Sequence, residues 1–269
     1  MSRAGPSTGA IVAPAAVLAA FLGLPVVALV ARAFAGDLAA AIASPEVLSA
    51  LALSLVTTAL SLVLAITLGT PLAWLLARRP FRGAGFVDAL IDLPIVLPPA
   101  VAGLALLLVF GRRGLIGASL EVLGVSIPFT IVAVVLAQTF VAAPFFVRSA
   151  RAGLAGVDRD LEDAARVDGA GERSVFRWIT APLAAPALAA GLVMCWARAL
   201  GEFGATIMFA GSLEGRTQTL PLVVYAEFQA GDLDASVAAA VILVFAALGV
   251  LVAVRAFGWG RALDARGVG

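Results

Sequence analysis

A charged pair, Arg198 and Glu202, interrupts one of the apolar stretches of this 269-residue chain. The two residues are four apart and therefore share one face of a helix. A charge near the centre of a bilayer costs about 2.5–3.5 kcal/mol on insertion scales, so such residues face a bundle interior or water. Two interpretations follow. The pair neutralises itself and locks helix packing, or it lies on a translocation route where Arg198 attracts an anion and Glu202 holds a gate.

The residues around this pair predict a broken helix. Glycines at positions 201, 204 and 211 interrupt the run ARALGEFGATIMFAG at residues 197–211. Broken helices in transporters line cavities rather than lipid. The candidates for a pore or gate are therefore Arg198, Gly201, Glu202, Phe203, Gly204 and Thr206.

A second irregular stretch, DLPIVLPP at residues 92–99, opens another apolar run. Pro98 and Pro99 each remove a backbone donor, so a helix here must bend or start late. A helix start with proline in its first turn and a pore-lining role both fit this pattern. Asp88 and Asp92 are four apart, and we expect them at the inner membrane interface.

Composition excludes several kinds of chemistry. Histidine and lysine are absent, Cys195 is the only cysteine, and all 18 basic residues are arginine. The chain therefore offers no Cys/His metal site, no internal disulfide and no lysine for a phosphate-binding loop that hydrolyses ATP. We expect no cofactor in this chain and no enzymatic activity of its own.

The elements that hold these residues are predicted to be apolar helices. Apolar residues make up 62% of the chain and charged residues 13%, against about 25% charged in a soluble domain. A helix needs about 20 apolar residues to cross the hydrocarbon layer. The six candidate spans are residues 10–31, 47–77, 93–111, 122–147, 178–197 with an extension to 210, and 235–254.

The first span also has features of a signal peptide, because Arg3 precedes it and small residues follow. Its 22 uncharged residues exceed a typical apolar core, however, and no clear cleavage site precedes a soluble domain. We expect an uncleaved helix that is peripheral to the other five.

Arginine placement predicts the orientation in the membrane. With the N-terminus inside, the inner segments carry 13 arginines and the outer segments four. Short cytoplasmic loops are enriched in arginine and lysine. We therefore expect both termini in the cytoplasm, although Arg112 and Arg113 fall on the outer side.

One long hydrophilic segment, residues 148–177, lies on the predicted inner side. Asp158 is a suitable N-cap, and acidic residues that favour the positive end of a helix follow it. Gly169 is expected to end this helix. On charge alone, this pattern is typical of a short, solvated helix at the membrane surface.

The spacing within this segment resembles the EAA loop of ABC importer permeases. That family's pattern is E-A-A, three residues, G, nine residues, I-x-L-P, and five of its seven fixed positions match here. Asp163 replaces the family's glutamate on a shorter stem, and Ala181 replaces its leucine. The matching positions are Ala164, Ala165, Gly169, Ile179 and Pro182.

This resemblance implies a coupling helix. In that family the loop docks into a groove of a separate cytoplasmic ATPase subunit, and small residues such as Ala164, Ala165 and Gly169 let it seat closely. Pro182 is expected to begin the next span, where its missing N–H costs little.

The stretch GEFGAT at residues 201–206 is similar to the fifth helix of molybdate and tungstate permeases, whereas sulfate permeases show G-E-Y-G-S. The stretch DLPIVLPPAVAGLAL at residues 92–106 is similar to the same family. The resemblance implies a homodimer surrounded by membrane lipid, with two copies of an ABC ATPase that uses ATP and Mg, and no nucleic acid. It also implies an external oxyanion-binding protein, for which the mixed charges at residues 211–234 suit docking.

Together these observations predict an all-α membrane protein with about six transmembrane helices and the type I ABC importer fold, in the cytoplasmic membrane. We expect an N-terminal helix and outer loop at residues 1–46, a permease core at 47–254 and a cytoplasmic tail at 255–269. The predicted function is ATP-driven import of molybdate or tungstate.

Two alternatives remain at this point. A sulfate or thiosulfate permease is the first. An ion-coupled secondary transporter, with Arg198 and Glu202 as a proton relay, is the second, but it does not account for the EAA-like loop.

Overall fold

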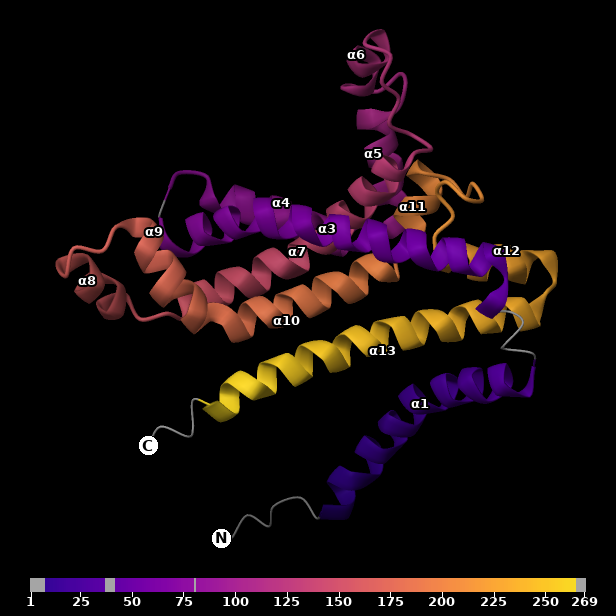
Figure 1. Cartoon of the computed structure of the whole chain (residues 1–269), viewed down its shortest axis with the longest axis horizontal. Helices are drawn as coiled ribbons and strands as arrows, with labels where there is room; N and C mark the ends of the chain where they lie inside the picture. Colours follow the sequence, from indigo (N-terminus) through magenta and orange to yellow (C-terminus); the bar gives the residue numbers. More distant parts are fainter. Residues whose placement is uncertain (1–7, 37–41, 80, 265–269) are drawn as a thin grey trace.

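Every regular element is helical in the computed structural model, which describes residues 8–36, 42–79 and 81–264 (Figure 1). Arg3 and residues 265–269 of the predicted tail lie outside these ranges. The elements are α1 (Thr8–Ala35), α3 (Pro45–Arg78), α4 (Ala84–Val96), α5 (Pro99–Phe110), α6 (Gly117–Val122), α7 (Ile131–Ala155), α8 (Arg159–Val167), α9 (Glu172–Val175), the π-helix η1 (Phe176–Thr180), α10 (Ala181–Leu200), α11 (Gly204–Phe209), α12 (Leu220–Ala230) and α13 (Leu233–Asp264).

Within the described residues, five helices are long and apolar enough to cross a membrane, and a bent pair adds a sixth if it forms one span. The five segments are Val12–Ala35, Pro45–Arg78, Ile131–Ala155, Glu172–Leu200 and Leu233–Val250. The pair is α4 and α5, which meet at an angle of 119° around Leu97 and Pro98. The bend expected at Pro98 and Pro99 is therefore confirmed, and the span predicted at residues 93–111 is broken into two helices, the first of which begins earlier, at Ala84.

The fourth predicted span is displaced along the chain, since α7 begins at Ile131 and not at residue 122. Gly124 and Phe129 have positive φ angles of 75° and 61°, which are incompatible with a continuing α-helix. The Thr130 hydroxyl then caps α7 by accepting from an amide of its first turn at 3.4 Å.

At its other end α7 continues past residue 147 and carries two arginines within the helix. Arg148 binds Asp92 and Arg151 binds Asp88, and both acidic residues lie on α4. These two ion pairs hold α4 against the end of α7.

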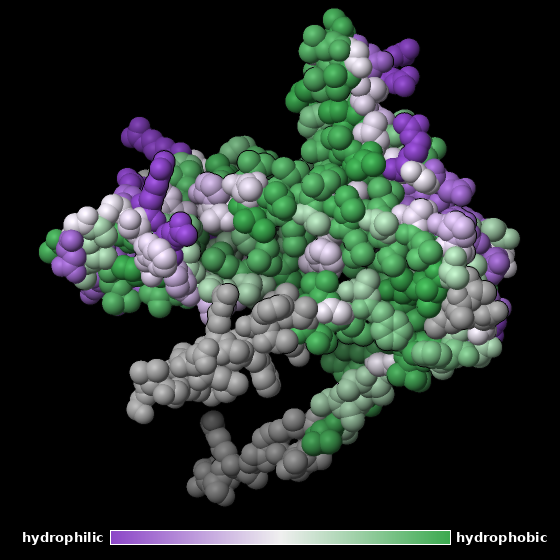
Figure 2. Space-filling model, viewed as in Figure 1, coloured by the Kyte–Doolittle hydropathy of each residue, from purple (hydrophilic) through white to green (hydrophobic). Residues whose placement is uncertain are grey.

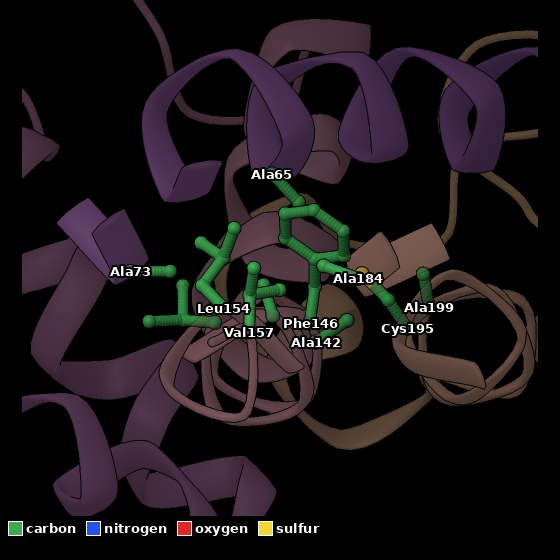
Figure 3. Close-up of a cluster of buried hydrophobic side chains, with 11 residues drawn as sticks. Ala65, Ala73, Ala142, Phe146, Leu154, Val157, Ala184, Cys195 and Ala199 are labelled. Carbon is green, nitrogen blue, oxygen red and sulfur yellow. The ribbon is translucent and has the colours of Figure 1, made fainter. Parts of the chain in front are cut away.

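The centre of the bundle is α7, which packs between α3 and α10 (Figure 1). Small residues let these helices approach closely, as in other membrane bundles where burial against lipid tails gives little driving force. A Cβ on Gly153 of α7 would lie 2.4 Å from the Ala187 Cβ of α10. Figure 3 shows Phe146 of α7 pointing toward Ala65 of α3, inside a cluster made mostly of alanines.

Helix α1 lies at the edge of the bundle, as the sequence predicts. It contacts α13, and Arg32 forms an exposed ion pair with Asp234 at 2.9 Å. None of the apolar window of its span is buried within the chain. Figure 2 shows hydrophobic surface over the middle of the molecule and hydrophilic surface gathered toward the end with α8 and α9 and toward the opposite end. That distribution suits a protein that crosses a bilayer.

Candidate coupling loop and translocation elements

The hydrophilic segment predicted on the inner side contains the short helix that its sequence predicts. The Asp158 carboxylate caps α8 by accepting from the Asp160 amide at 3.0 Å. Gly169 then adopts a φ of 90°, which favours glycine, and the chain leaves the helix. No neighbouring heavy atom of the described residues lies within 4 Å of a Cβ built on Gly169, so it is the backbone conformation that favours glycine here.

The predicted coupling residues of α8 lie on its accessible side. The Asp163 side chain is 67% exposed, Ala164 is exposed and Ala165 is half-buried. Arg166 donates to Asp163 at 2.6 Å and to Glu172 at 2.8 Å. The hydrogen bonds to Glu172 and then to Asp163 raise the pKa of the Arg166 guanidinium, which therefore stays charged. The helix thus presents small residues and fixed charges on an open face.

The other two predicted loop residues, Ile179 and Pro182, lie on the helix that follows, in η1 and in the first turn of α10. The sequence predicts that the next span begins at Pro182. In the structure the span instead runs through this residue, from Glu172 to Leu200. A proline inside a helix lacks the N–H and crowds the carbonyl four residues earlier. The π-turn of η1, closed by the Ala181 amide on the Phe176 carbonyl, stands directly before this proline and accommodates it.

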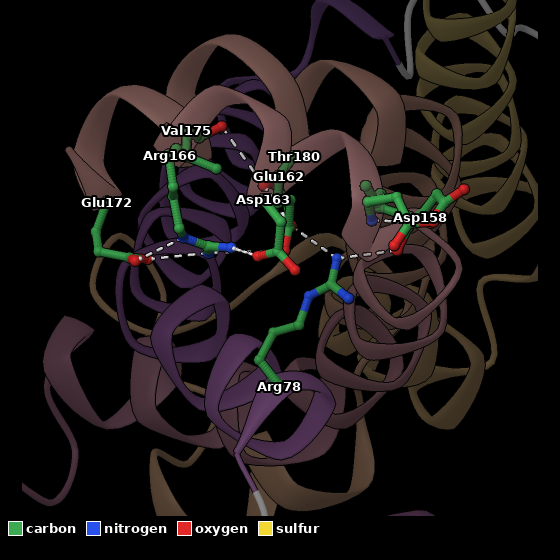
Figure 4. Close-up of polar contacts among 10 residues, drawn as sticks. Arg78, Asp158, Glu162, Asp163, Arg166, Glu172, Val175 and Thr180 are labelled. Carbon is green, nitrogen blue, oxygen red and sulfur yellow. Dashed lines mark hydrogen bonds and ion pairs between the residues drawn. The ribbon is translucent and has the colours of Figure 1, made fainter. Parts of the chain in front are cut away.

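A buried network ties the loop to the spanning helices (Figure 4). The Arg78 guanidinium donates to Glu162 Oε1 at 2.7 Å, and the Thr180 hydroxyl donates to the same oxygen at 2.7 Å. Arg78 also donates to the carbonyl of Val157 at 3.1 Å. The side chains of Arg78 and Glu162 are only 8% and 5% exposed.

The sequence does not predict this network. Arg78 and Glu162 are 84 residues apart, and an arginine at the end of an apolar span indicates topology alone. The local signal is weak, because Glu162 stands among other acidic residues in a helix that is otherwise exposed.

A polar cavity of about 260 Å³ adjoins the network, where the end of α3 faces α8 and α9. Trp74, Arg79 and Phe176 line it beside the buried pair. The Arg79 guanidinium lies 5.8 Å from the centroid of the Trp74 ring, within the range of a cation–π contact. The space between loop and spanning helix is therefore partly open and not a packed apolar core.

The second candidate region is the break after α10, which the glycines predict. α10 ends at Leu200 and α11 begins at Gly204. Arg198 Nη1 lies 2.6 Å from Glu202 Oε2, so the predicted pair forms. Glu202 Oε1 also accepts from the Ala205 amide at 2.7 Å and so caps the start of α11. The Glu202 carboxylate therefore contacts α10 on one side of the break and α11 on the other.

The two irregular segments of the sequence meet in space, which the sequence does not predict. A Cβ on Gly204 would lie 2.7 Å from the Pro99 Cβ at the start of α5. A Cβ on Gly103 of α5 would lie 2.6 Å from the Ala205 carbonyl oxygen. The backbones of α5 and α11 thus touch, and glycine is the residue that permits it.

The pore candidates differ in how far they reach the surface of the single chain. Glu202 is 1% exposed, and Thr206 is fully buried with no hydrogen-bond partner for its hydroxyl in the part of the chain that the structure describes. Phe203 is half-buried, and its ring centroid lies 5.0 Å from that of Tyr225 on α12. The Arg198 side chain, at 28% exposure, is the member of the charged pair that remains accessible.

Comparison with known proteins identifies the family. Residues 69–266 match the family described as "Binding-protein-dependent transport system inner membrane component". The molybdenum transport system permease protein ModB of Mycobacterium tuberculosis is 45% identical, over 88% of this chain and 89% of the relative. A probable molybdenum ABC transporter permease protein of Haloferax volcanii is 40% identical, over 91% of this chain and 88% of the relative.

A solved structure shares the fold at much lower sequence identity. It is a bacterial ABC transporter involved in the import of the acidic polysaccharide alginate, and it matches with a TM-score of 0.73 and 18% identity. The match covers 92% of this chain and 93% of that one. The fold is therefore that of an ABC importer transmembrane subunit. The chain belongs to the family of binding-protein-dependent transport system inner membrane components, as a multi-pass permease subunit of an ABC transporter and not as its ATPase.

Proposed function

We propose that this chain is the permease through which an ATP-driven importer passes molybdate, with tungstate as an alternative substrate of nearly the same size and charge. The observation that carries this proposal is the 45% identity to a molybdenum permease across 88% of the chain. The GEFGAT run at residues 201–206 supports it, because this run is similar to the fifth helix of molybdate and tungstate permeases.

The transporter works as a homodimer of this chain, with two cytoplasmic ABC ATPases and an external oxyanion-binding protein. Both termini lie in the cytoplasm, so that α8 faces the ATPases. The exposed residues Asp163 and Ala164 and the turn at Gly169 support docking there, because a close contact needs small side chains and a defined register. Closure of the ATPases on ATP moves α8, and α8 moves the helices above it.

In the membrane, the break between α10 and α11 is the element that changes. Arg198 presents a positive charge near this break, and its partial exposure lets it meet an anion that has left the binding protein. Glu202 is buried and bonded to the start of α11, so it positions the arginine and holds the two half-helices together. Alternating access then exposes this region outward and inward in turn.

The test is molybdenum uptake at trace molybdate, in cells lacking this chain and in cells with the chain restored, with and without excess sulfate. We expect uptake to return with the chain and to resist sulfate. Uptake that excess sulfate abolishes would assign the chain to sulfate import within the same family.

The same cells distinguish the source of energy. Dissipating the proton gradient while ATP is maintained should leave uptake in place. Loss of uptake under that condition would point to ion-coupled transport, with Arg198 and Glu202 as the proton relay.

A further inference from the structure

Glu162 is the single buried residue of α8, a helix otherwise open to its surroundings. A buried carboxylate is costly unless it is paired and hydrogen-bonded. Here one oxygen, Oε1, accepts from Arg78 of α3 and from Thr180 of η1, each at 2.7 Å. The other oxygen, Oε2, lies 3.8 Å from Arg166 within α8 itself.

The three partners come from three separate elements. Arg78 is the last residue of α3, Glu162 is in the middle of α8, and Thr180 ends η1 at the base of α10. Arg78 also fixes the chain that enters α8, through the carbonyl of Val157 at 3.1 Å. Figure 4 shows Arg78 and Thr180 approaching Glu162 from different helices.

None of the apolar residues of α8 is buried, so this network is the contact that ties the helix itself to α3, while Val157, just before the helix, belongs to the apolar cluster that includes Ala73 of α3. The cavity of about 260 Å³ lies beside this network, so apolar packing does not fill this junction. Hydrogen bonds to a charged group are short and directional, and they hold a geometry that loose packing does not.

The π-helix explains how Thr180 reaches the carboxylate. One extra residue in a helical turn rotates the following positions by about 100° relative to a regular α-helix. Thr180 is the last residue of η1 and is 1% exposed, with its hydroxyl on Glu162. The π-turn therefore serves two needs, since it accommodates Pro182 and aims Thr180 at the loop.

We propose that Glu162 is a positioning residue that fixes α8 to α3 and to α10 at once, so that a displacement of the loop reaches both spanning helices together. The proposal rests on the proposed function, because it assumes that an ATPase moves α8. Arg78 connects Glu162 to α3, and Thr180 connects it to η1 at the start of α10. Their role differs from that of Asp163, which lies on the outward face of α8.

The first experiment compares Thr180→Val with Thr180→Ser in vesicles that hold the complete transporter. Valine keeps the shape of threonine but removes the hydroxyl, and serine keeps the hydroxyl. Because a hydrogen bond to a charged group is lost, we expect Thr180→Val to lower molybdate uptake per ATP hydrolysed by about tenfold. Thr180→Ser should stay close to the unsubstituted transporter.

The matched control is Thr67→Val, because the Thr67 hydroxyl is exposed and donates to backbone carbonyls of α3 itself. This variant should leave the ratio unchanged. If Thr180→Val also leaves molybdate uptake per ATP hydrolysed unchanged, the proposed role of Glu162 is overturned.

A second variant separates positioning from stability. Replacing Arg78 and Glu162 together by methionine removes both buried charges, and such apolar replacements are neutral or stabilising in other proteins. We expect this double variant to insert and to assemble with the ATPase, while uptake per ATP stays low. Full recovery of coupling in the stable double variant would show that the pair serves folding alone.

A measurement that does not depend on the substrate tests the positioning role of Glu162 separately from the proposed function. Spin labels on Asp160→Cys of α8 and Leu75→Cys of α3 report the distance between the two helices, and the buried Cys195 stays in place. In the otherwise unsubstituted complex this distance should stay constant when the ATPases bind nucleotide, and it should change in the double methionine variant. A distance that already changes without the substitutions would overturn the proposal, whichever anion the transporter carries.

Discussion

The carboxylate of Glu202 offers a sharp test of the break between α10 and α11. In Glu202→Gln the amide oxygen still accepts from the Ala205 amide, but the charge that faces Arg198 is lost. Removing one partner of a buried ion pair costs about 3–5 kcal/mol. The Arg198 side chain keeps 28% exposure, which lowers the cost because it still reaches polar surroundings. We therefore expect a loss of about 2–3 kcal/mol in the free energy of unfolding.

Glu202→Ala goes one step further, because it also removes the cap of α11. The extra loss should be about 1 kcal/mol, the usual value of an N-terminal cap. The measurement is reversible unfolding of the purified chain in mixed micelles, followed by tryptophan fluorescence. Glu214→Gln in an exposed loop is the matched control and should change stability by less than about 0.5 kcal/mol.

The double variant Arg198→Met with Glu202→Gln then separates packing from transport. It should recover most of the stability, since no unpaired charge remains. Transport should stay low if the arginine meets the anion. Full transport and full stability in Glu202→Gln itself would refute the reasoning, because Glu202 would then be neither a lock nor part of a gate.

Three further outcomes follow from the same structure. Gly169→Asp should leave the chain in the membrane but abolish ATP-driven uptake, because an aspartate strains the positive φ of 90° and adds charge to the face that we propose docks on the ATPase. Normal uptake in membranes that contain the variant would contradict this. Gly103→Ala should cost about 1–3 kcal/mol in unfolding experiments, because its Cβ would meet the backbone of α11 at 2.6 Å, whereas Gly85→Ala, with open space around it, should not destabilise. Asp92→Asn removes an ion pair at the edge of the bundle, and thermal unfolding should register a loss of no more than about 1 kcal/mol.

The sequence was sufficient for features that depend on neighbouring residues. Long apolar runs predict the spans, and glycines predict the break at Gly201. Asp158 and Gly169 predict the bounds of α8 closely, because caps and positive φ angles are local requirements. The coupling role of the loop stays a prediction, as do the division into domains and the uncleaved state of the first helix.

Features that depend on distant residues could not be predicted. The pairing of Arg78 with Glu162 joins residues 84 positions apart, and nothing near either one indicates the other. The contact of Gly204 with Pro99 joins two irregular segments in the same way. The displaced start of α7 has a different cause. The apolar residues at 122–130 predict part of a span, but the positive φ of Phe129 prevents a continuous helix there.

The most direct test of the central claim is uptake of labelled molybdate into vesicles that contain this chain and its ATPase, with the oxyanion-binding protein outside and ATP on the ATPase side. We predict uptake that needs all three proteins and ATP hydrolysis, and that disappears in Gly169→Asp. Uptake that proceeds without the ATPase, or no molybdate uptake by the complete and ATP-hydrolysing complex, would contradict the account.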